Sequence, residues 1–252
     1  MKNILNKIRI DNTLYLLMFL ALISGHIKRT FIILLIVLVH ELGHVFFFVL
    51  FNIDIESIVI YPFGGVTKVN KKIHERIYKD VLISLGGILF QFFLYLVFFW
   101  LFSNCFIEKS TFEVFEISNL SIILFNLLPI VPLDGSKLLF SLFTKLFSFK
   151  KSLLLQKIVG CFFLVLFVLY TANKGLNDVV TIVFLVVQLF SLFKENKYIL
   201  NKFYLERVLY DNYYDGIYND KNVGDMRLDK YYYFPEGNKY VNEKKYLIKN
   251  RF

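Results

Sequence analysis

The chain has 252 residues, of which 57% are hydrophobic and 19% aromatic, and its mean hydropathy is +0.57. A soluble globular protein of this length does not usually reach these values, so the composition indicates a membrane protein. The formal net charge of +9 fits membrane topology and contact with anionic lipid. We therefore expect the lipid bilayer, and not nucleic acid, as a partner.

Apolar segments recur along the chain and alternate with polar loops. They cover residues 13–25, 30–51, 80–103, 115–133, 153–172 and 177–193. A helix needs about 20 apolar residues to cross a bilayer, so we expect an all-α polytopic membrane protein with about six transmembrane helices. The first segment is short for a bilayer. Three alternatives account for this: residues 8–12 lengthen it at the interface, it tilts little, or it is a cleaved signal sequence.

The second apolar segment contains the motif His40-Glu41-Leu42-Gly43-His44. Positions i and i+4 of a helix lie on one face, so His40 and His44 can bind the same zinc ion while Glu41 remains available as a base. This spacing also arises by chance in unrelated chains. Ionisable residues are costly inside a membrane, however, and mark a functional site by default. The motif therefore predicts a metal-dependent hydrolase at membrane depth.

Residues 52–69, between the second and third spans, have the composition of a β-hairpin. Isoleucine and valine are frequent there, and Gly64 and Gly65 permit a tight turn. We expect a short membrane-associated hairpin whose open edge holds an extended peptide, which makes Gly64 and Gly65 candidates for positioning a substrate. A surface hairpin with no such role is the alternative.

The third span contains a pair of glycines followed by an amide. Gly86 and Gly87 predict close packing between helices, with a place on the substrate path as the alternative, and Gln91 lies one turn further on. We expect Gln91 either to form a hydrogen bond across the helix bundle or to lie against Asn126 near the site, where it is a third candidate for positioning the substrate.

A second polar motif, Asn126-Leu127-Leu128-Pro129-Ile130-Val131-Pro132-Leu133-Asp134-Gly135, follows the fourth apolar run. Its two prolines disfavour helix, and a broken backbone at membrane depth is tolerated only against protein or a watery cavity. Asp134 would face that cavity and supply a carboxylate to complete a site of two histidines and one acid. The alternative is a surface loop in which Asp134 is the N-cap of the next helix.

Polar composition begins abruptly at Lys194. Residues 194–252 carry eleven of the sixteen tyrosines and many Asn, Asp and Lys residues. We divide the chain into a membrane core, residues 1–193, and a tail, residues 194–252. The tail is a small folded cap, a partner-docking segment or partly disordered, and its aromatic content argues against full disorder. His26 and His74 are expected to be solvated.

Basic residues concentrate in the loops on one side of the predicted spans. They are Lys2, Lys7, Arg9, Lys68, Lys71, Lys72, Arg76, Lys79, Lys145, Lys150, Lys151, Lys194, Lys197 and Lys202. The opposite loops carry fewer, although Lys28 and Arg29 depart from the pattern. The positive-inside rule therefore predicts that both termini lie in the cytoplasm.

The two motifs resemble those of the site-2 protease family of intramembrane zinc metalloproteases, which are H-E-x-G-H and N-x-x-P-x-x-P-L-D-G. The resemblance covers roughly residues 8–145. It implies that His40, His44 and Asp134 bind one zinc ion per chain and that Glu41 is the catalytic base. Asn126 matches the family's asparagine, which implies a catalytic role in binding the substrate backbone or the oxyanion.

Other segments indicate a branch within that family. Residues 62–66 resemble the glycine-containing stretch that follows the first motif in the branch that contains the sporulation sigma-factor processing protease. Residues 86–91 occupy the place of the family's G-P-x-x-N turn, with Ile88 for proline and Gln91 for asparagine. Directly after Asp134 and Gly135, Ser136 and Lys137 replace the glycine and arginine that are usual in the family. These departures leave the predicted metal ligands intact.

The predicted function is hydrolysis of a peptide bond within or next to the bacterial cell membrane. The resemblance implies that the substrate is a membrane-tethered regulatory protein and that the sporulation branch would cleave a sigma-factor precursor. A regulatory membrane partner is one further candidate partner. A zinc transporter is one alternative, but it would need further polar ligands, and the fifth and sixth spans offer almost none. A catalytically idle scaffold is another, but it would be expected to have lost Glu41 or a ligand.

Overall fold

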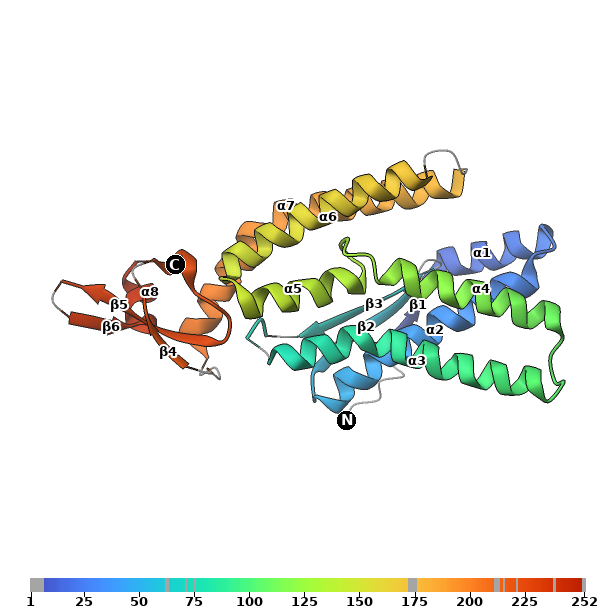
Figure 1. Cartoon of the computed structure of the whole chain (residues 1–252), viewed down its shortest axis with the longest axis horizontal. Coiled ribbons are helices and arrows are strands. Elements are labelled where there is room, and N and C mark those ends of the chain that lie inside the picture. The colour runs from blue at the N-terminus through green and yellow to red at the C-terminus, as the bar shows by residue number, and fades with distance from the viewer. Residues whose placement is uncertain are drawn as a thin grey trace. The chain divides into compact units, whose positions relative to one another are not determined.

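The computed structural model describes residues 7–61, 64–70, 72–74, 76–171, 176–210, 214, 216–220, 222–237 and 239–250. Among these residues the helices are α1 (Asn12–Ile23), α2 (Ile27–Leu50), α3 (Ile77–Ser103), α4 (Lys109–Asn126), α5 (Asp134–Leu146), α6 (Phe149–Thr171), α7 (Leu176–Leu209) and α8 (Glu243–Lys249) (Figure 1). The strands are β1 (Ile8–Ile10), β2 (Asp54–Tyr61), β3 (Gly64–Asn70), β4 (Gly216–Asn219), β5 (Lys230–Glu236) and β6 (Lys239–Asn242). The predicted helical character is confirmed.

Four of the helices in the described part of the chain are long and apolar enough to cross a membrane. They cover residues 27–50, 77–103, 149–171 and 179–209, whereas α1 is shorter. Helix α4, with three charged residues in its first half, is not among them. An integral membrane protein is therefore supported, while the count of six spans stays a prediction.

The backbone divides into two compact units. The first unit comprises residues 1–71 and 82–126, and the second comprises residues 72–81 and 127–252. The boundary at Asn126 is where α4 ends, and the next helix begins at Asp134. This interruption is the one that Pro129 and Pro132 predict, because proline removes a backbone donor and its ring obstructs the preceding turn.

A three-stranded sheet in the first unit has the order β1-β2-β3. Strands β2 and β3 pair antiparallel from Asp54 opposite Asn70 to Tyr61 opposite Gly64, which confirms the predicted hairpin. Residues 62 and 63, which join the strands, lie outside the described residues. Strand β1 pairs parallel with β2, so residues 8–10 belong to the sheet, and of the residues that could lengthen the first span only Asn12 lies in α1. The first helix begins at Asn12, because the Asp11 side chain caps it by accepting from the Thr13 N–H.

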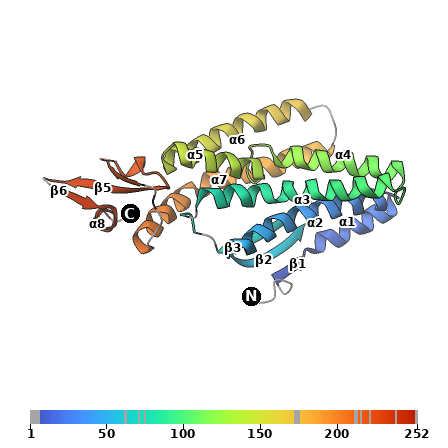
Figure 2. The ribbon, with the colours of Figure 1, turned by 60° about the horizontal axis from the view of Figure 1, so that its bottom comes forward.

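Helices α2 and α3 approach closely at a pair of glycines. A Cβ atom built on Gly43 would lie 2.2 Å from the Gly86 carbonyl oxygen, so neither residue can carry a side chain without separating the two backbones. Further along, Phe98 of α3 stacks on Phe115 of α4 with ring centroids 3.8 Å apart. The predicted close packing at Gly86 is confirmed, and Figure 2 shows α2, α3 and α4 running alongside one another.

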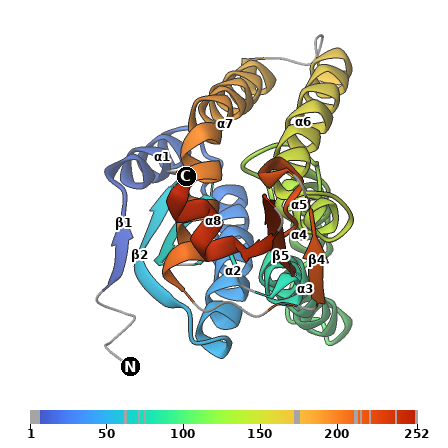
Figure 3. The ribbon, with the colours of Figure 1, turned by 90° about the vertical axis from the view of Figure 1, so that its left-hand side faces the viewer.

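The second unit contains α5, α6, α7 and the remainder of the chain. Helix α7 continues without a break past Lys194 to Leu209. Beyond it, β4, β5 and β6 form a second three-stranded sheet, which the sequence did not predict (Figure 1). Figure 3 shows β4 and β5 of this sheet together with α8. Its core is the cluster Phe149, Leu153, Phe203, Tyr204, Met226, Leu228, Tyr232, Phe234 and Leu247. The described part of the tail is therefore folded, with the first turn of α6 in its core.

A buried ion pair crosses this core. The Arg207 guanidinium donates to the Glu243 carboxylate at 2.7 Å, and both side chains are fully buried. Arg207 Nε also donates to His74 Nε2 at 3.1 Å, while His74 Nδ1 lies 3.3 Å from the Glu206 carboxylate. The prediction of a solvated His74 is wrong. Burial lowers the pKa of His74, which fits a neutral ring that accepts at Nε2 and donates from Nδ1.

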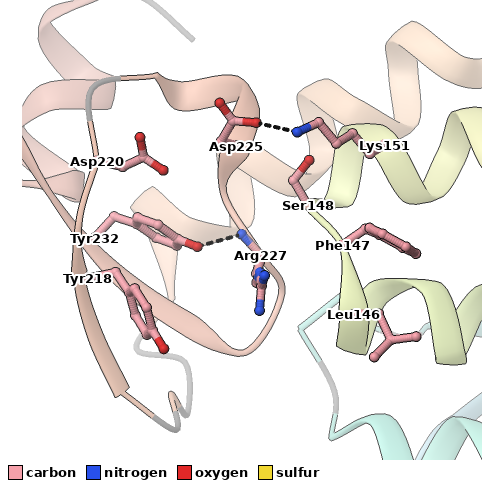
Figure 4. Close-up of a pocket in the computed structure, with 9 residues that line it drawn as sticks. All are labelled: Leu146, Phe147, Ser148, Lys151, Tyr218, Asp220, Asp225, Arg227 and Tyr232. Atoms are coloured by element: carbon pink, nitrogen blue, oxygen red, sulfur yellow. Dashed lines mark hydrogen bonds and ion pairs between the residues drawn. The ribbon is translucent and has the colours of Figure 1, made fainter.

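A cavity of about 270 Å³ lies in the second unit between residues 146–151 and the second sheet (Figure 4). Lys151 is paired with Asp225 at 3.1 Å on its wall, and the Arg227 N–H donates to the Tyr232 hydroxyl. Charges of both signs line it, and none of the predicted site residues does. We assign it no part in hydrolysis.

Candidate metal centre

His40 and His44 lie one helical turn apart on the buried face of α2. Their Nε2 atoms are 3.1 Å apart. Zinc–nitrogen bonds are about 2.0–2.1 Å, so two imidazole nitrogens on a tetrahedral zinc ion are separated by about 3.4 Å. The spacing of the two rings therefore fits a shared metal ion, as the H-E-x-x-H motif predicts.

The hydrogen-bond network assigns the proton on each ring. His44 Nδ1 lies 2.7 Å from the Ile83 carbonyl oxygen, which can only accept, so this nitrogen carries the proton. His40 Nδ1 lies 2.9 Å from Gln91 Oε1, and that oxygen is likewise an acceptor. On neutral rings, Nε2 of each histidine is therefore the nitrogen that can bind a metal ion.

Helix α3 supplies the space and the partner for His40. A Cβ atom on Gly87 would lie 2.3 Å from the His40 ring, so glycine is required at this position. Gln91, which is fully buried, donates from Nε2 to Asn119 Oδ1 of α4 at 3.1 Å. The prediction that Gln91 bonds across the bundle is confirmed, and its partners are His40 and Asn119 instead of Asn126. Asn119 was missed, although it lies on the same helix as Asn126.

Glu41 points toward the hairpin instead of joining the histidine pair. Its Oε1 accepts from the Gly65 N–H at 3.1 Å, and its side chain is half-buried. A Cβ atom on Gly65 would lie 2.6 Å from Glu41 Cδ. Gly65 lies within β3 opposite Ile60, and the described glycines with positive φ are Gly25 and Gly237. The turn role predicted for Gly65 is therefore wrong, because the position requires glycine for space beside the carboxylate.

Asp134 is the first residue of α5 in the second unit, and its side chain is buried. Leu133 is the N-cap of this helix, so the alternative in which Asp134 caps it is wrong. The Asp134 carboxylate pairs with Lys137 Nζ at 2.8 Å. Ser136, one of the positions that departs from the family pattern, accepts from Gln156 of α6 at 2.9 Å. Asn126, the last residue of α4 in the first unit, is half-buried.

Comparison with known proteins points to one family. Residues 29–109 and 105–170 match the model of peptidase family M50. Stage IV sporulation protein FB of Bacillus subtilis is 38% identical over 204 residues, which are 80% of this chain and 71% of that protein. A zinc metalloprotease of Methanocaldococcus jannaschii is 29% identical over 52% of this chain and 39% of its own length.

A similar fold is found among solved structures. The site-2 protease from Methanocaldococcus jannaschii aligns with a TM-score of 0.54 at 22% sequence identity, covering 75% of this chain and 90% of that one. At this identity the likeness concerns the fold alone.

Proposed function

The chain belongs to peptidase family M50, the site-2 protease family, and from this premise we propose that it hydrolyses a peptide bond within or next to the membrane in a membrane-tethered regulatory protein. The observation that carries the proposal is the approach of His40 Nε2 and His44 Nε2 to 3.1 Å on α2, beside the Glu41 carboxylate, which is hydrogen-bonded to Gly65 instead. Metal ligands and a separate base are the two parts that metal-assisted hydrolysis requires.

We assign the metal to one Zn²⁺ per chain, held by His40, His44 and Asp134. The family resemblance and the buried carboxylate of Asp134 support the third ligand. Bound zinc would lower the pKa of a coordinated water and polarise the scissile carbonyl. The chain's own contribution is to fix both imidazole rings by their Nδ1 hydrogen bonds, so that Nε2 is available on each.

Glu41 is the proposed general base. It takes the proton of the attacking water and passes it to the leaving amine. The Gly65 N–H holds the Glu41 carboxylate at one orientation while leaving its second oxygen for the water. Asn126 is proposed to donate to the substrate backbone or to the oxyanion.

The outer edge of β3 is the proposed substrate track. Among the described strands of this sheet, β2 lies between β1 and β3, so β3 forms an edge, and Gly65 on it contacts the base. Gly64 begins the same strand. An extended peptide paired with this edge would present its carbonyls beside Glu41, whereas a helical substrate keeps them hydrogen-bonded internally. Gln91, the third substrate-positioning candidate, contacts His40 Nδ1, and this contact supports a role in holding the His40 ring.

The substrate class we propose is a sigma-factor precursor tethered to the membrane, in keeping with the similarity to a sporulation protein. The test is co-expression of the full chain with a tethered precursor, using Glu41→Gln as the inactive control. Zinc-dependent cleavage by the parent chain and none by the control is the expected result. Zinc uptake into cells without cleavage of any tethered precursor would favour a transporter instead.

We further propose that the chain lies in the bacterial cell membrane with six spans and both termini in the cytoplasm. Residues 1–193 would form the proteolytic core, and the tail, residues 194–252, would offer a docking surface to a regulatory membrane partner. Reporters fused after Lys72 and at the C-terminus should report cytoplasm, and one near Lys109 the opposite side. A C-terminal reporter found outside the cytoplasm would contradict the even number of spans.

A further inference from the structure

Two buried amides connect the candidate metal centre to α4. Gln91 is fully buried and Asn119 is 3% exposed. A buried amide is costly unless it is hydrogen-bonded, and a leucine at either position would fill the space between apolar helices without that cost. Their presence therefore calls for a purpose beyond packing.

The hydrogen bond to Asn119 determines which end of the Gln91 amide faces His40. Gln91 Nε2 donates to Asn119 Oδ1 at 3.1 Å, which leaves Gln91 Oε1 to face His40 Nδ1 at 2.9 Å. If the Gln91 amide rotated by half a turn, its NH₂ group would face His40 instead. Nδ1 would then have to accept, and the ring proton would move to Nε2, where it would block metal binding.

We propose that Asn119 is a positioning residue that selects the metal-binding tautomer of His40 through Gln91. Asn119 touches neither the metal nor the substrate; its carbonyl oxygen determines which end of the Gln91 amide faces His40. This inference rests on the metal site of the proposed function. The spacing on α4 agrees with it, because Asn119 and Asn126 are two helical turns apart and share one face.

The decisive experiment is a double-mutant cycle on the full chain in detergent, with zinc affinity measured by competition against a chromogenic chelator. Asn119→Leu keeps the branching and the number of heavy atoms of the side chain and removes the acceptor, and it should weaken zinc binding by about 10- to 100-fold. Gln91→Glu places an acceptor oxygen toward His40 in either orientation. In that background Asn119→Leu should change zinc affinity by less than about 3-fold.

The cycle separates positioning from a purely structural role. A structural role for Asn119 predicts the same loss of affinity in both backgrounds, and that result would overturn the proposal. Ser118→Ala, a change at a neighbouring buried polar residue, should leave zinc affinity unchanged. With saturating zinc, Asn119→Leu should recover most of its turnover with an unaltered KM.

The outcomes also distinguish this inference from the proposed function. A parent chain that binds no zinc would remove the metal site itself. If the parent chain binds zinc and the Asn119→Leu variant binds it equally tightly, the protease proposal stands and only the role of Asn119 is refuted.

Discussion

Replacing His44 with alanine should remove zinc from the purified chain, whereas replacing Glu41 with glutamine should leave the zinc content near one per chain and abolish cleavage. The difference follows from the hydrogen bonds of the two residues. His44 Nε2 faces His40 Nε2, and its Nδ1 is already committed to a backbone carbonyl, so its loss removes a metal ligand. Glu41 binds the Gly65 N–H and stands apart from the pair.

The expected size of the effect on activity is large for both variants. Loss of a general base lowers turnover by about 10²- to 10⁴-fold, and loss of the metal removes the activated water as well. Zinc content would be measured by atomic absorption on detergent-purified protein, alongside cleavage of a tethered precursor. Asp134→Ala should behave as His44→Ala does.

His26→Ala is the matched control, because His26 is an exposed histidine at the start of the same helix. It should retain both zinc and activity. Full zinc occupancy in His44→Ala would refute the histidine pair as ligands, and full occupancy with full activity in Asp134→Ala would refute the third ligand. Cleavage at the parent rate by Glu41→Gln would transfer the role of base to another residue.

The features that the sequence predicts well are those fixed by short-range geometry. The i, i+4 spacing of His40 and His44 determines that they share a helical face wherever that helix lies. The same holds for the end of α4 at Asn126, because Pro129 and Pro132 act on the turn next to them. The β-hairpin also depends on neighbouring segments, and its pairing from Asp54 to Tyr61 follows from their β-branched composition.

The features that were missed depend on partners far apart in the sequence. Gln91 and Asn119 are 28 residues apart, and nothing near either one indicates the other. His74 resembles a solvated loop residue among lysines, yet Glu206 and Arg207 of α7 bury it. Strand β1 forms only because β2 offers it an edge fifty residues later in the sequence. A signal for Asn119 was present in its seven-residue spacing from Asn126, since polar residues that share a face of an apolar helix mark a common environment.

Gly65→Ala should lower cleavage by about 100-fold while zinc content and folded yield stay close to those of the parent chain. The new Cβ atom would lie 2.6 Å from Glu41 Cδ, so one of the two groups has to move. The obstructing atoms belong to the outer part of a flexible side chain, which can rotate away at little cost to the fold. The base is then displaced from the water that it must deprotonate, and the loss falls on turnover.

Two other glycines make this prediction specific. Gly216 also lies in a strand, but a Cβ atom there would make ordinary contacts at 3.7 Å, so Gly216→Ala should preserve cleavage. At Gly43 the obstructing atom is the Gly86 carbonyl oxygen at 2.2 Å, and backbone cannot swing aside, so Gly43→Ala should reduce the folded yield itself. Cleavage by Gly65→Ala at the parent rate would show that the contact between β3 and Glu41 does not position the base. A loss of zinc in Gly65→Ala would instead indicate that β3 supports the histidine pair. The hydrogen bond between Gly65 and Glu41 alone does not predict that result.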